Sequence, residues 1–377
     1  GKRLPKGENL LDNNTKFTYI RVADFQDNGT INLQNIKFIN ENTYNVLKNY
    51  KIYDDNLYIS IAGTIGKSGI IPKELNGAIL TENAVKLEYI QNNISNKFMY
   101  FFTLSNIFKT QIQTSTKIVA QPKLAITRLK QIQIPLPPLK EQERIVGILD
   151  ESFAKIDESI KILEQNLLNL DELMQSALQK AFNPLKDNAK ENYKLPQSWE
   201  WKSLEEISEN ISAGGDKPKN CTESKTAKNQ IPVYANGVNN NGLVGYTDKA
   251  TIIKPSLTIS ARGTIGFVCI RKEPYFPIVR LISLIPCENI LCLHYLYFCL
   301  NFFIAKGEGS SIPQLTIPKF KSLQIPLPPL KEQEQIAKHL DFVFEKTKAL
   351  KELYTKELKD YEELKQSLLN KAFKGEL

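Results

Sequence analysis

The sequence is poor in the residues that most often carry chemistry. Its 377 residues include only two histidines, two methionines and two tryptophans, together with five cysteines. The cysteines show no Cys-x-x-Cys spacing and all lie in the second half of the chain: Cys221, Cys269, Cys287, Cys292 and Cys299. This distribution argues against a disulfide framework or a zinc site. His294 and His339 lie in an apolar segment and a heptad-patterned segment, so we interpret both as structural residues.

Apolar runs long enough to cross a membrane are also lacking. The most apolar stretch, residues 290–304, is short and contains His294 and Asn301, so we expect a buried helix there. No secretory signal precedes the first domain, which predicts a cytoplasmic protein without a membrane partner.

Cofactor loops and catalytic motifs are scarce as well. Gly66-Lys67-Ser68 resembles the end of a phosphate-binding loop, but that motif needs a glycine where the chain has Ile61. A second copy of the segment has Phe267 in place of Lys67, so we interpret it as a turn shared by two domains. We find no glycine-rich cofactor loop, no Asn-Pro-Pro-aromatic methyltransferase motif and no convincing set of nuclease carboxylates. The sequence thus predicts a non-enzymatic chain that binds no cofactor or metal itself.

The strongest feature that is present is an internal repeat. The segment IPLPPLKEQE occurs at residues 134–143 and again at 325–334, and each copy leads into a long run of helix-forming residues. Both runs close on Lys-Ala-Phe, at residues 180–182 and 371–373, which keeps the offset of 191 residues. A proline pair suits a helix start, because an N–H group in the first turn has no partner within the helix, so a proline there loses no helical hydrogen bond. We therefore expect two helices of specified length, each about 45 residues and roughly 65 Å long.

Both predicted helices carry apolar residues in alternating steps of three and four, the pattern of a coiled-coil seam. In the second helix, Thr347 and Lys351 interrupt this stripe. We expect the two helices to pack against each other, the alternative being that each covers its own domain. The stripes are Ile145, Leu149, Phe153, Ile156, Ile160, Leu163, Leu167, Leu170 and Met174 in the first helix, and Ile336, Leu340, Phe344, Leu350, Tyr354, Leu358, Tyr361 and Leu368 in the second.

The rest of the chain forms two related globular domains. Ile-Ser-Ile-Ala-Gly-Thr-Ile-Gly at residues 59–66 corresponds to Ile-Ser-Ala-Arg-Gly-Thr-Ile-Gly at 259–266. Runs of β-branched and aromatic residues alternate with Asn-Gly turns, which favours mixed α+β domains. The predicted order is a first globular domain at 1–136, a central helix at 137–183, a second globular domain at 184–327 and a C-terminal helix at 328–377.

The net positive charge lies outside the predicted helices. The chain has a formal net charge of +8, whereas residues 138–182 and 329–377 together carry −4, which leaves +12 for the remainder. Two basic domains joined by acidic or neutral helices indicate a polyanion contacted at two places, because lysines and arginines gain by releasing phosphate counterions. The alternative is an ordinary basic protein that binds no nucleic acid.

These motifs resemble the specificity subunit of type I restriction-modification systems. The resemblance rests on the duplicated Pro-Pro-Leu-Lys-Glu-Gln-Glu helix start, the Leu-Pro-Gln-Ser-Trp-Glu-Trp segment at 195–201 and the duplicated Gly-Thr-Ile-Gly. It implies two target-recognition domains that each read half of a bipartite, asymmetric site on double-stranded DNA. It also implies an antiparallel coiled coil that fixes the spacer, with the halves related by a pseudo-twofold axis.

The resemblance further implies partner subunits. Two modification subunits would bring S-adenosylmethionine and methylate adenine, and restriction subunits would bring ATP hydrolysis, magnesium and cleavage. Two other hypotheses stay open: a coiled-coil scaffold that joins protein partners without reading DNA, and a fused methyltransferase-endonuclease, which would need a catalytic motif not found in the sequence.

The two halves differ at their beginnings. The second half opens on Leu-Pro-Gln-Ser-Trp-Glu-Trp, whereas the first starts at Gly1 without an equivalent segment or an initiating methionine. Residues 1–7 align near 213–219. We therefore expect residues before Gly1 to be missing and the first recognition domain to lack its opening strand and helix.

Candidate DNA contacts are chosen by residue type and place in predicted loops or strand ends. Arginine can fork onto guanine, lysine can hold phosphate, and asparagine and glutamine can pair with adenine edges. The alternative for each is a turn residue or a solvated charge. The candidates are Tyr19, Arg21, Lys67 and Lys117 in the first domain, and Lys217, Lys219, Tyr234, Asn236, Asn239, Asn240, Arg262 and Gln314 in the second.

Overall fold

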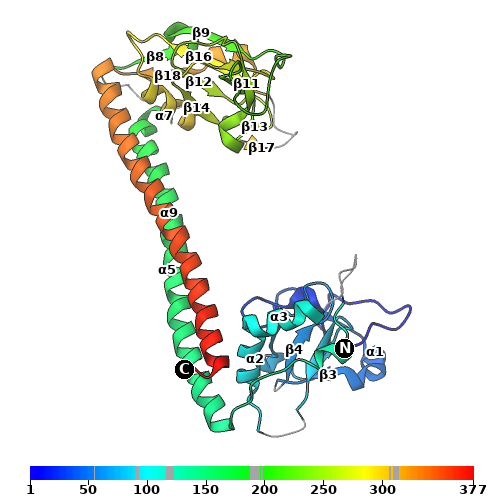
Figure 1. The fold of residues 1–377 in the computed structure, drawn as a ribbon. Coiled ribbons are helices and arrows are strands. Elements are labelled where there is room, and N and C mark those ends of the chain that lie inside the picture. The colour runs from blue at the N-terminus through cyan, green and yellow to red at the C-terminus, as the bar shows by residue number, and fades with distance from the viewer. Residues whose placement is uncertain are drawn as a thin grey trace. The chain divides into compact units, whose positions relative to one another are not determined.

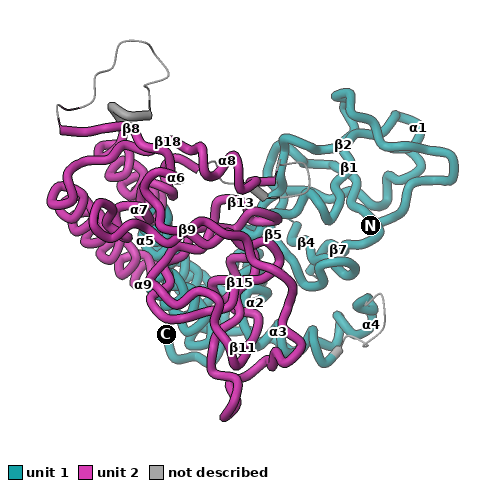
Figure 2. The backbone as a smooth tube through the Cα atoms, turned by 90° about the horizontal axis from the view of Figure 1, so that it is seen from above, with its two compact units in different colours: residues 1–164, 355–377 teal, residues 165–354 magenta. Residues whose placement is uncertain are grey.

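The computed structural model describes residues 1–54, 56–89, 93–115, 123–186, 196, 198–304, 307–308 and 314–377. It divides into two compact units, one made of residues 1–164 and 355–377 and the other of residues 165–354 (Figure 2). The long helices α5 (Leu139–Lys186) and α9 (Leu330–Lys374) each contribute to both units (Figure 1). Each unit therefore joins a globular part to one stretch of each long helix.

Short strands and helices make up the globular part of unit 1. Its described strands form a sheet of order β2-β1-β6-β3 and a second of order β5-β4-β7. The strands are β1 (Thr18–Ile20), β2 (Lys37–Phe38), β3 (Lys51–Ile52), β4 (Leu57–Ser60), β5 (Ser68–Ile70), β6 (Ala78–Leu80) and β7 (Ala84–Leu87), and the helices are α1 (Glu41–Val46), α2 (Asn96–Leu104), α3 (Asn106–Ser115) and α4 (Ile126–Leu129).

Unit 2 has a larger globular part. Its main described sheet has the order β14-β12-β16-β9, next to a sheet of order β11-β10-β15 and the pairs β13-β17 and β18-β8. The elements are β8 (Glu200–Ser203), α6 (Leu204–Ile207), β9 (Ser208–Ala213), β10 (Ile231–Tyr234), β11 (Leu243–Thr247), β12 (Ser256–Ile259), β13 (Thr264–Ile265), β14 (Val268–Arg271), β15 (Phe276–Pro277), β16 (Ile282–Pro286), α7 (Leu293–Phe303), β17 (Gly307–Glu308), α8 (Ile317–Lys321) and β18 (Gln324–Leu327).

The two globular parts share a frame. In unit 1, β4 pairs antiparallel with β5 and β7, and in unit 2, β12 pairs antiparallel with β14 and β16. The duplicated Gly-Thr-Ile-Gly forms the same turn in both: Gly66 (φ 86°) donates its N–H to Ser60 O at 2.9 Å, and Gly266 (φ 80°) donates to Ser260 O at 3.0 Å. A left-handed φ favours glycine, which explains the repeated residue. The interpretation of Gly66-Lys67-Ser68 as a shared turn is confirmed.

Unit 2 also contains elements that unit 1 does not show among its described residues. Strand β9 extends the main sheet by pairing with β16, and β8 pairs with β18 just before the second proline pair. The stretch of unit 1 equivalent to β18, residues 133–136, is not assigned to a strand.

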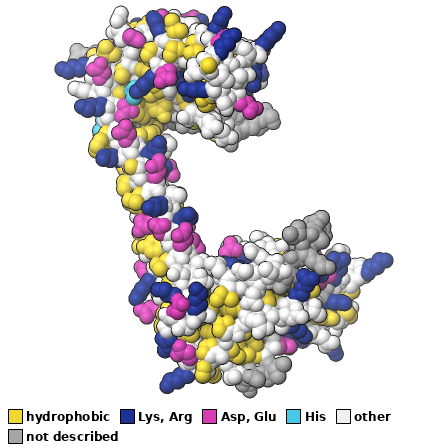
Figure 3. Space-filling view, viewed as in Figure 1, with side chains coloured by type: hydrophobic (Ala, Val, Ile, Leu, Met, Phe, Trp, Pro, Cys, Tyr) yellow, Lys and Arg dark blue, Asp and Glu magenta, His cyan; other side chains and the backbone are white. Residues whose placement is uncertain are grey.

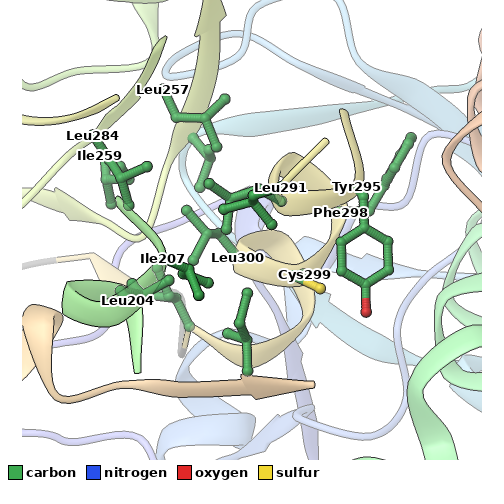
Figure 4. Packing of buried hydrophobic residues seen from close by; sticks show 14 of the residues in the cluster. Leu204, Ile207, Leu257, Ile259, Leu284, Leu291, Tyr295, Phe298, Cys299 and Leu300 are labelled. Atoms are coloured by element: carbon green, nitrogen blue, oxygen red, sulfur yellow. The ribbon is translucent and has the colours of Figure 1, made fainter. Parts of the chain in front are cut away.

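Each globular part buries an apolar core against the long helices. In unit 2, Leu257, Ile259 and Leu284 from the sheet pack with α6 and with the apolar helix α7, which buries Tyr295 and Phe298 (Figure 4). The expected buried helix within residues 290–304 is thus present. Among the residues with assigned structure, no helix combines the length and apolar character that a membrane crossing needs.

The long helices run antiparallel within each unit. In unit 1, Asp157 of α5 pairs with Lys365 of α9 at 2.5 Å, and Arg144, nearer the start of α5, donates to Leu377 O at the chain end. In unit 2, Asp171 pairs with Lys351, and Leu178 packs in one cluster with Leu340. The two helices therefore pack on each other, as the heptad pattern predicts.

The seam of α9 differs in detail from the predicted stripe. Thr347 is 2 % exposed and Lys351 is half-buried against Asp171, whereas Leu350 is 38 % exposed. Thr347 fits because its hydroxyl donates to the carbonyls of Val343 (2.9 Å) and Phe344 (3.0 Å) on its own helix, so this hydroxyl has a partner although it is buried. The prediction that Leu350 belongs to the seam, and that Thr347 and Lys351 interrupt it, is wrong.

A buried glutamine fastens the start of each long helix to its globular part. Gln333 is 0 % exposed: its Oε1 accepts from Cys292 N at 2.9 Å, and its Nε2 donates to Ile290 O (2.9 Å) and Pro328 O (2.8 Å). Gln142 repeats this geometry with Ser95 N (2.9 Å), Asn93 O (3.0 Å) and Pro137 O (2.8 Å). We call this arrangement the glutamine clasp; it explains why the glutamine of the repeated Lys-Glu-Gln-Glu helix start is not an arbitrary polar residue.

Replacing Gln333 with alanine should destabilise unit 2 by about 1–3 kcal/mol, because it leaves polar main-chain groups without partners in a buried place. Both tryptophans of the chain, Trp199 and Trp201, lie in unit 2, so the urea midpoint of tryptophan fluorescence reports on that unit. The matched control is Gln142→Ala, which removes the same clasp from unit 1. Equal shifts of the tryptophan midpoint in both variants would contradict a clasp that acts within its own unit.

Candidate nucleic-acid interface

The structure uses most of the unit 1 candidates internally. Tyr19 is 4 % exposed and donates its hydroxyl to Lys2 O at 2.8 Å, and burial raises its pKa. Arg21 forks onto the buried Asp24, with Nη2 at 2.5 Å from Oδ1 and Nε at 3.1 Å from Oδ2. Lys67 pairs with Asp27 at 2.7 Å. Lys117 lies outside the described residues.

These contacts show which of the unit 1 candidates remain available to bind DNA. Tyr19 is a core residue, because a side chain so enclosed offers no edge to a base. Arg21 is the N-cap residue of the short helical turn Val22–Asp24, and its backbone N–H and guanidinium both donate to the Asp24 carboxylate. The structure therefore does not support Tyr19 or Arg21 as DNA contacts. Lys67 stays a candidate, because its ion pair with the solvent-exposed Asp27 is weak and does not commit the side chain.

In unit 2 a buried arginine anchors the asparagine-rich turn. The guanidinium of Arg271 lies 3.5 Å from the centre of the Tyr234 ring, donates through Nε to Thr258 Oγ1 at 3.0 Å and donates through Nη2 to Asn241 O. The short helical turn Asn239–Gly242 contains left-handed φ values at Asn240 (47°) and Asn241 (53°). Asn239 and Asn240 are exposed on it, whereas Tyr234 is half-buried beneath Arg271. Tyr234 thus supports the turn that displays the two asparagines.

Asn236 joins three loops. Its Oδ1 accepts from Ala261 N at 2.8 Å and its Nδ2 donates to Val279 O at 2.7 Å. Both ends of the amide are thereby used within the protein. We interpret Asn236 as a residue that positions these loops rather than as a reader of adenine.

Arg262 and Gln314 come together in space although 52 residues separate them in the chain. Arg262 Nε donates to Gln314 Oε1 at 3.1 Å. Both side chains line a cavity of about 400 Å³, together with Arg280 and the backbone around Gly214. Arg280 was not among the sequence candidates, because Pro-Ile-Val-Arg-Leu-Ile reads as a continuous strand.

The exposed lysines add positive charge around these loops. Lys217 and Lys219 are exposed on the segment after β9 and form no ion pair with the described residues. On the face shown in Figure 3, lysine and arginine side chains stand out from the globular parts, whereas acidic and basic side chains alternate along the helices. This face agrees with the net positive charge that the sequence assigns to the globular parts.

Among the described residues, no group of three or more histidines, cysteines, aspartates or glutamates could hold a metal ion. The fully buried Cys299 has its pKa raised by burial, which keeps the thiol neutral, and all five cysteines are free. His294 is held by Asp341, with Nδ1 at 2.7 Å from Oδ2, as expected for a structural histidine. The described arginine, lysine and amide side chains of this surface supply hydrogen-bond donors and positive charge, which suit an acceptor-rich polyanion.

The fold and this surface together define a class: a recognition protein with two related basic α+β domains and a two-helix antiparallel coiled coil. Comparison with known proteins agrees. The family model for the type I restriction modification DNA specificity domain matches residues 1–168 and again 196–360. The chain therefore belongs to the family of type I restriction-modification specificity subunits.

Individual relatives support the family. A putative type I specificity subunit of Mycoplasma pneumoniae is 30 % identical over 347 residues, covering 90 % of this chain and 85 % of the relative. Among solved structures, a chain from a study of complex assembly and conformational transition of the type I R-M system has a TM-score of 0.79 at 20 % identity, covering 100 % of both chains. The HsdS subunit from Thermoanaerobacter tengcongensis has a TM-score of 0.60 at 20 % identity, covering 100 % of this chain and 98 % of that one. The predicted fold class is confirmed.

Proposed function

We propose that this chain is the DNA-recognition subunit of a type I restriction-modification complex, in which each globular part reads one half of a bipartite, asymmetric site. The observation that carries the proposal is the repeated frame with divergent loops. The same strands and the same Gly-Thr-Ile-Gly turn recur in both units, while the exposed polar residues around them differ. Two globular parts of this kind can offer the same frame to two identical partner subunits. Their different exposed side chains can meanwhile bind two different DNA sequences.

The coiled coil is proposed to set the spacer between half-sites and to dock the partner subunits. Large apolar side chains stay exposed along both helices in this single chain. They are Leu139, Ile162, Leu168 and Leu173 on α5, and Phe342, Leu350, Leu353 and Leu364 on α9.

The chemistry is proposed to belong to those partners. Two modification subunits would bind S-adenosylmethionine and methylate adenine, and restriction subunits would use ATP and magnesium. This chain would itself catalyse no reaction and would act in the cytoplasm, where it meets DNA.

The test is co-expression of the chain with its modification subunit in a host free of adenine methylation, followed by mapping of N6-methyladenine across the genome. A bipartite motif with a fixed gap supports the proposal and names both half-sites. A stable complex that methylates no motif would favour a protein scaffold without DNA readout.

Removing two phosphate-binding lysines should weaken binding to every DNA sequence alike. For the Lys217→Ala/Lys219→Ala variant we expect the slope of log affinity against log salt to fall by about 2, because each phosphate contact contributes close to one released counterion. Fluorescence anisotropy of the assembled complex on specific and random duplexes measures this slope. The matched control is Lys228→Ala, since Lys228 already faces Asp248 at 3.8 Å. A slope unchanged in the double variant would remove both lysines from the interface.

A further inference from the structure

The backbone beside the Arg262–Gln314 cavity is held in a conformation that its residues disfavour. Val279 (φ 52°) and Arg280 (φ 59°) both adopt left-handed φ values, which are rare for any residue other than glycine and especially for a β-branched one. Val279 is also 51 % exposed, so apolar burial does not account for its position. Strain of this kind persists where surrounding contacts impose it, and it concentrates at binding sites.

The surrounding contacts that impose this turn can be named. Val279 N donates to Gly215 O and Arg280 N donates to Gly214 O, both at 2.8 Å, while Asn236 Nδ2 donates to Val279 O at 2.7 Å. Gly214 is required for this approach, because a Cβ there would lie 2.6 Å from Ile278 N. The turn is therefore clamped from two sides, and it sets Arg280 on the wall of the cavity that Arg262 and Gln314 also line.

The cavity is rich in hydrogen-bond donors. Arginine carries five N–H donors in a planar fork, and among the described residues the bond from Arg262 to Gln314 uses the Nε donor alone. Its volume of about 400 Å³ falls in the range of small-ligand sites. An acceptor-rich group fits such a place, and duplex DNA offers two: the O6/N7 edge of guanine in the major groove and the phosphate oxygens.

Unit 1 has the same frame around different side chains. Leu315 N donates to Ala261 O at 3.2 Å in unit 2, and Leu124 N donates to Ile61 O at 2.8 Å in unit 1. The strand registers agree as well, with Ile259 opposite Ile282 and Ile59 opposite Val85. These pairs fix the equivalent positions of the two units. The residues of unit 1 that correspond to Arg262, Arg280 and Gln314 are Ala62, Asn83 and Lys123, in that order. An Arg-Arg-Gln set thus stands where the other unit has Ala-Asn-Lys.

We propose that Arg262, Arg280 and Gln314 are the guanine-reading residues of the second domain, and that Ala62, Asn83 and Lys123 hold the equivalent reading positions in the first. The inference rests on the proposed function and deepens it, because it assigns one half-site to a named cavity and a named base. The strained turn fixes the backbone position from which the Arg280 side chain lines the cavity. The alternative is that these side chains bind a DNA phosphate, which offers the same kind of hydrogen-bond acceptor as the guanine edge.

The experiment compares methylomes of the chain co-expressed with its modification subunit. The wild-type complex should give a bipartite motif with at least one guanine–cytosine pair in one half-site. In Arg262→Ala and Arg280→Ala, discrimination at such a position should fall by about 5- to 150-fold, the loss of one forked contact, while the other half-site and the gap stay unchanged. Arg280→Lys keeps the charge and the fold but loses the fork, and should relax the same position. Lys319→Ala, an exposed change on the neighbouring α8, should leave the motif intact.

The outcomes separate the inference from the proposed function. A wild-type complex that yields no bipartite motif defeats the proposed function itself. With a bipartite motif present, any of three results overturns the inference alone: half-sites without a guanine–cytosine pair, arginine variants that lower methylation evenly at all sites, as a phosphate contact would, or arginine variants that change nothing. Relaxation confined to one half-site in both Arg280→Ala and Arg280→Lys establishes it.

Discussion

Phe182→Ala should lower the free energy of unfolding of unit 2 by about 3–5 kcal/mol, the usual cost of emptying a fully buried aromatic site. Phe182 is 0 % exposed near the end of α5. Its ring centre lies 5.8 Å from that of Tyr295, 5.4 Å from that of Phe302 and 6.1 Å from that of Phe303. The urea midpoint of tryptophan fluorescence should fall accordingly, since both tryptophans belong to unit 2.

The repeat supplies the control for this experiment. Phe373 closes α9 as Phe182 closes α5, and its ring packs on Phe98 at 5.1 Å and Phe102 at 5.3 Å in unit 1. Phe373→Ala should therefore reduce hydrogen-exchange protection in unit 1 peptides while moving the tryptophan midpoint far less. If Phe182→Ala shifted that midpoint by no more than Phe373→Ala, the two aromatic anchors would not act separately.

Removing one heptad from each long helix should shorten the gap in the recognised DNA site. Deleting 161–167 from α5 and 355–361 from α9 keeps the heptad phase and leaves the ion pairs Asp157–Lys365 and Asp171–Lys351 on either side of the cut. Seven helical residues span about 10 Å, so the gap can shrink by up to about 3 base pairs at 3.4 Å each. The methylome of the co-expressed variant measures the gap directly.

A variant of equal length provides the comparison. Alanine in place of the exposed residues Glu164, Gln165 and Lys356 changes the composition of the same segment and should leave the gap as it was. An active deletion variant that still methylates the original gap would show that the helices do not set the spacing.

The repeat and the helices could be predicted because their signals are local and periodic. Heptad spacing, proline pairs and duplicated motifs are read along the chain, and they led directly to α5, α9 and the shared turns. The seam around Thr347 could not be predicted in this way, because a threonine counts as polar until its hydroxyl is seen to bond to its own helix. The predicted domain boundaries stay a proposal.

The recognition residues were harder to predict because they depend on partners distant in sequence. Arg21 has the residue type of a base reader, yet Asp24, three residues on, occupies its fork. Arg280 was missed because nothing in Val-Arg signals a left-handed backbone. By contrast, the polarity of 236–241 correctly indicated an exposed turn at Asn239 and Asn240, although Asn236 itself is used to hold loops together.

The glutamine clasp has a consequence for how such a molecule can change. Among the described residues, every hydrogen-bond partner of the Gln142 and Gln333 side chains is a main-chain N–H or C=O. The joint between the long helix and the globular part therefore does not depend on which side chains the globular part carries. A foreign domain whose backbone follows the same path would be held equally well. One globular part could therefore be exchanged for another without any change to the glutamine or to the helix start that holds it.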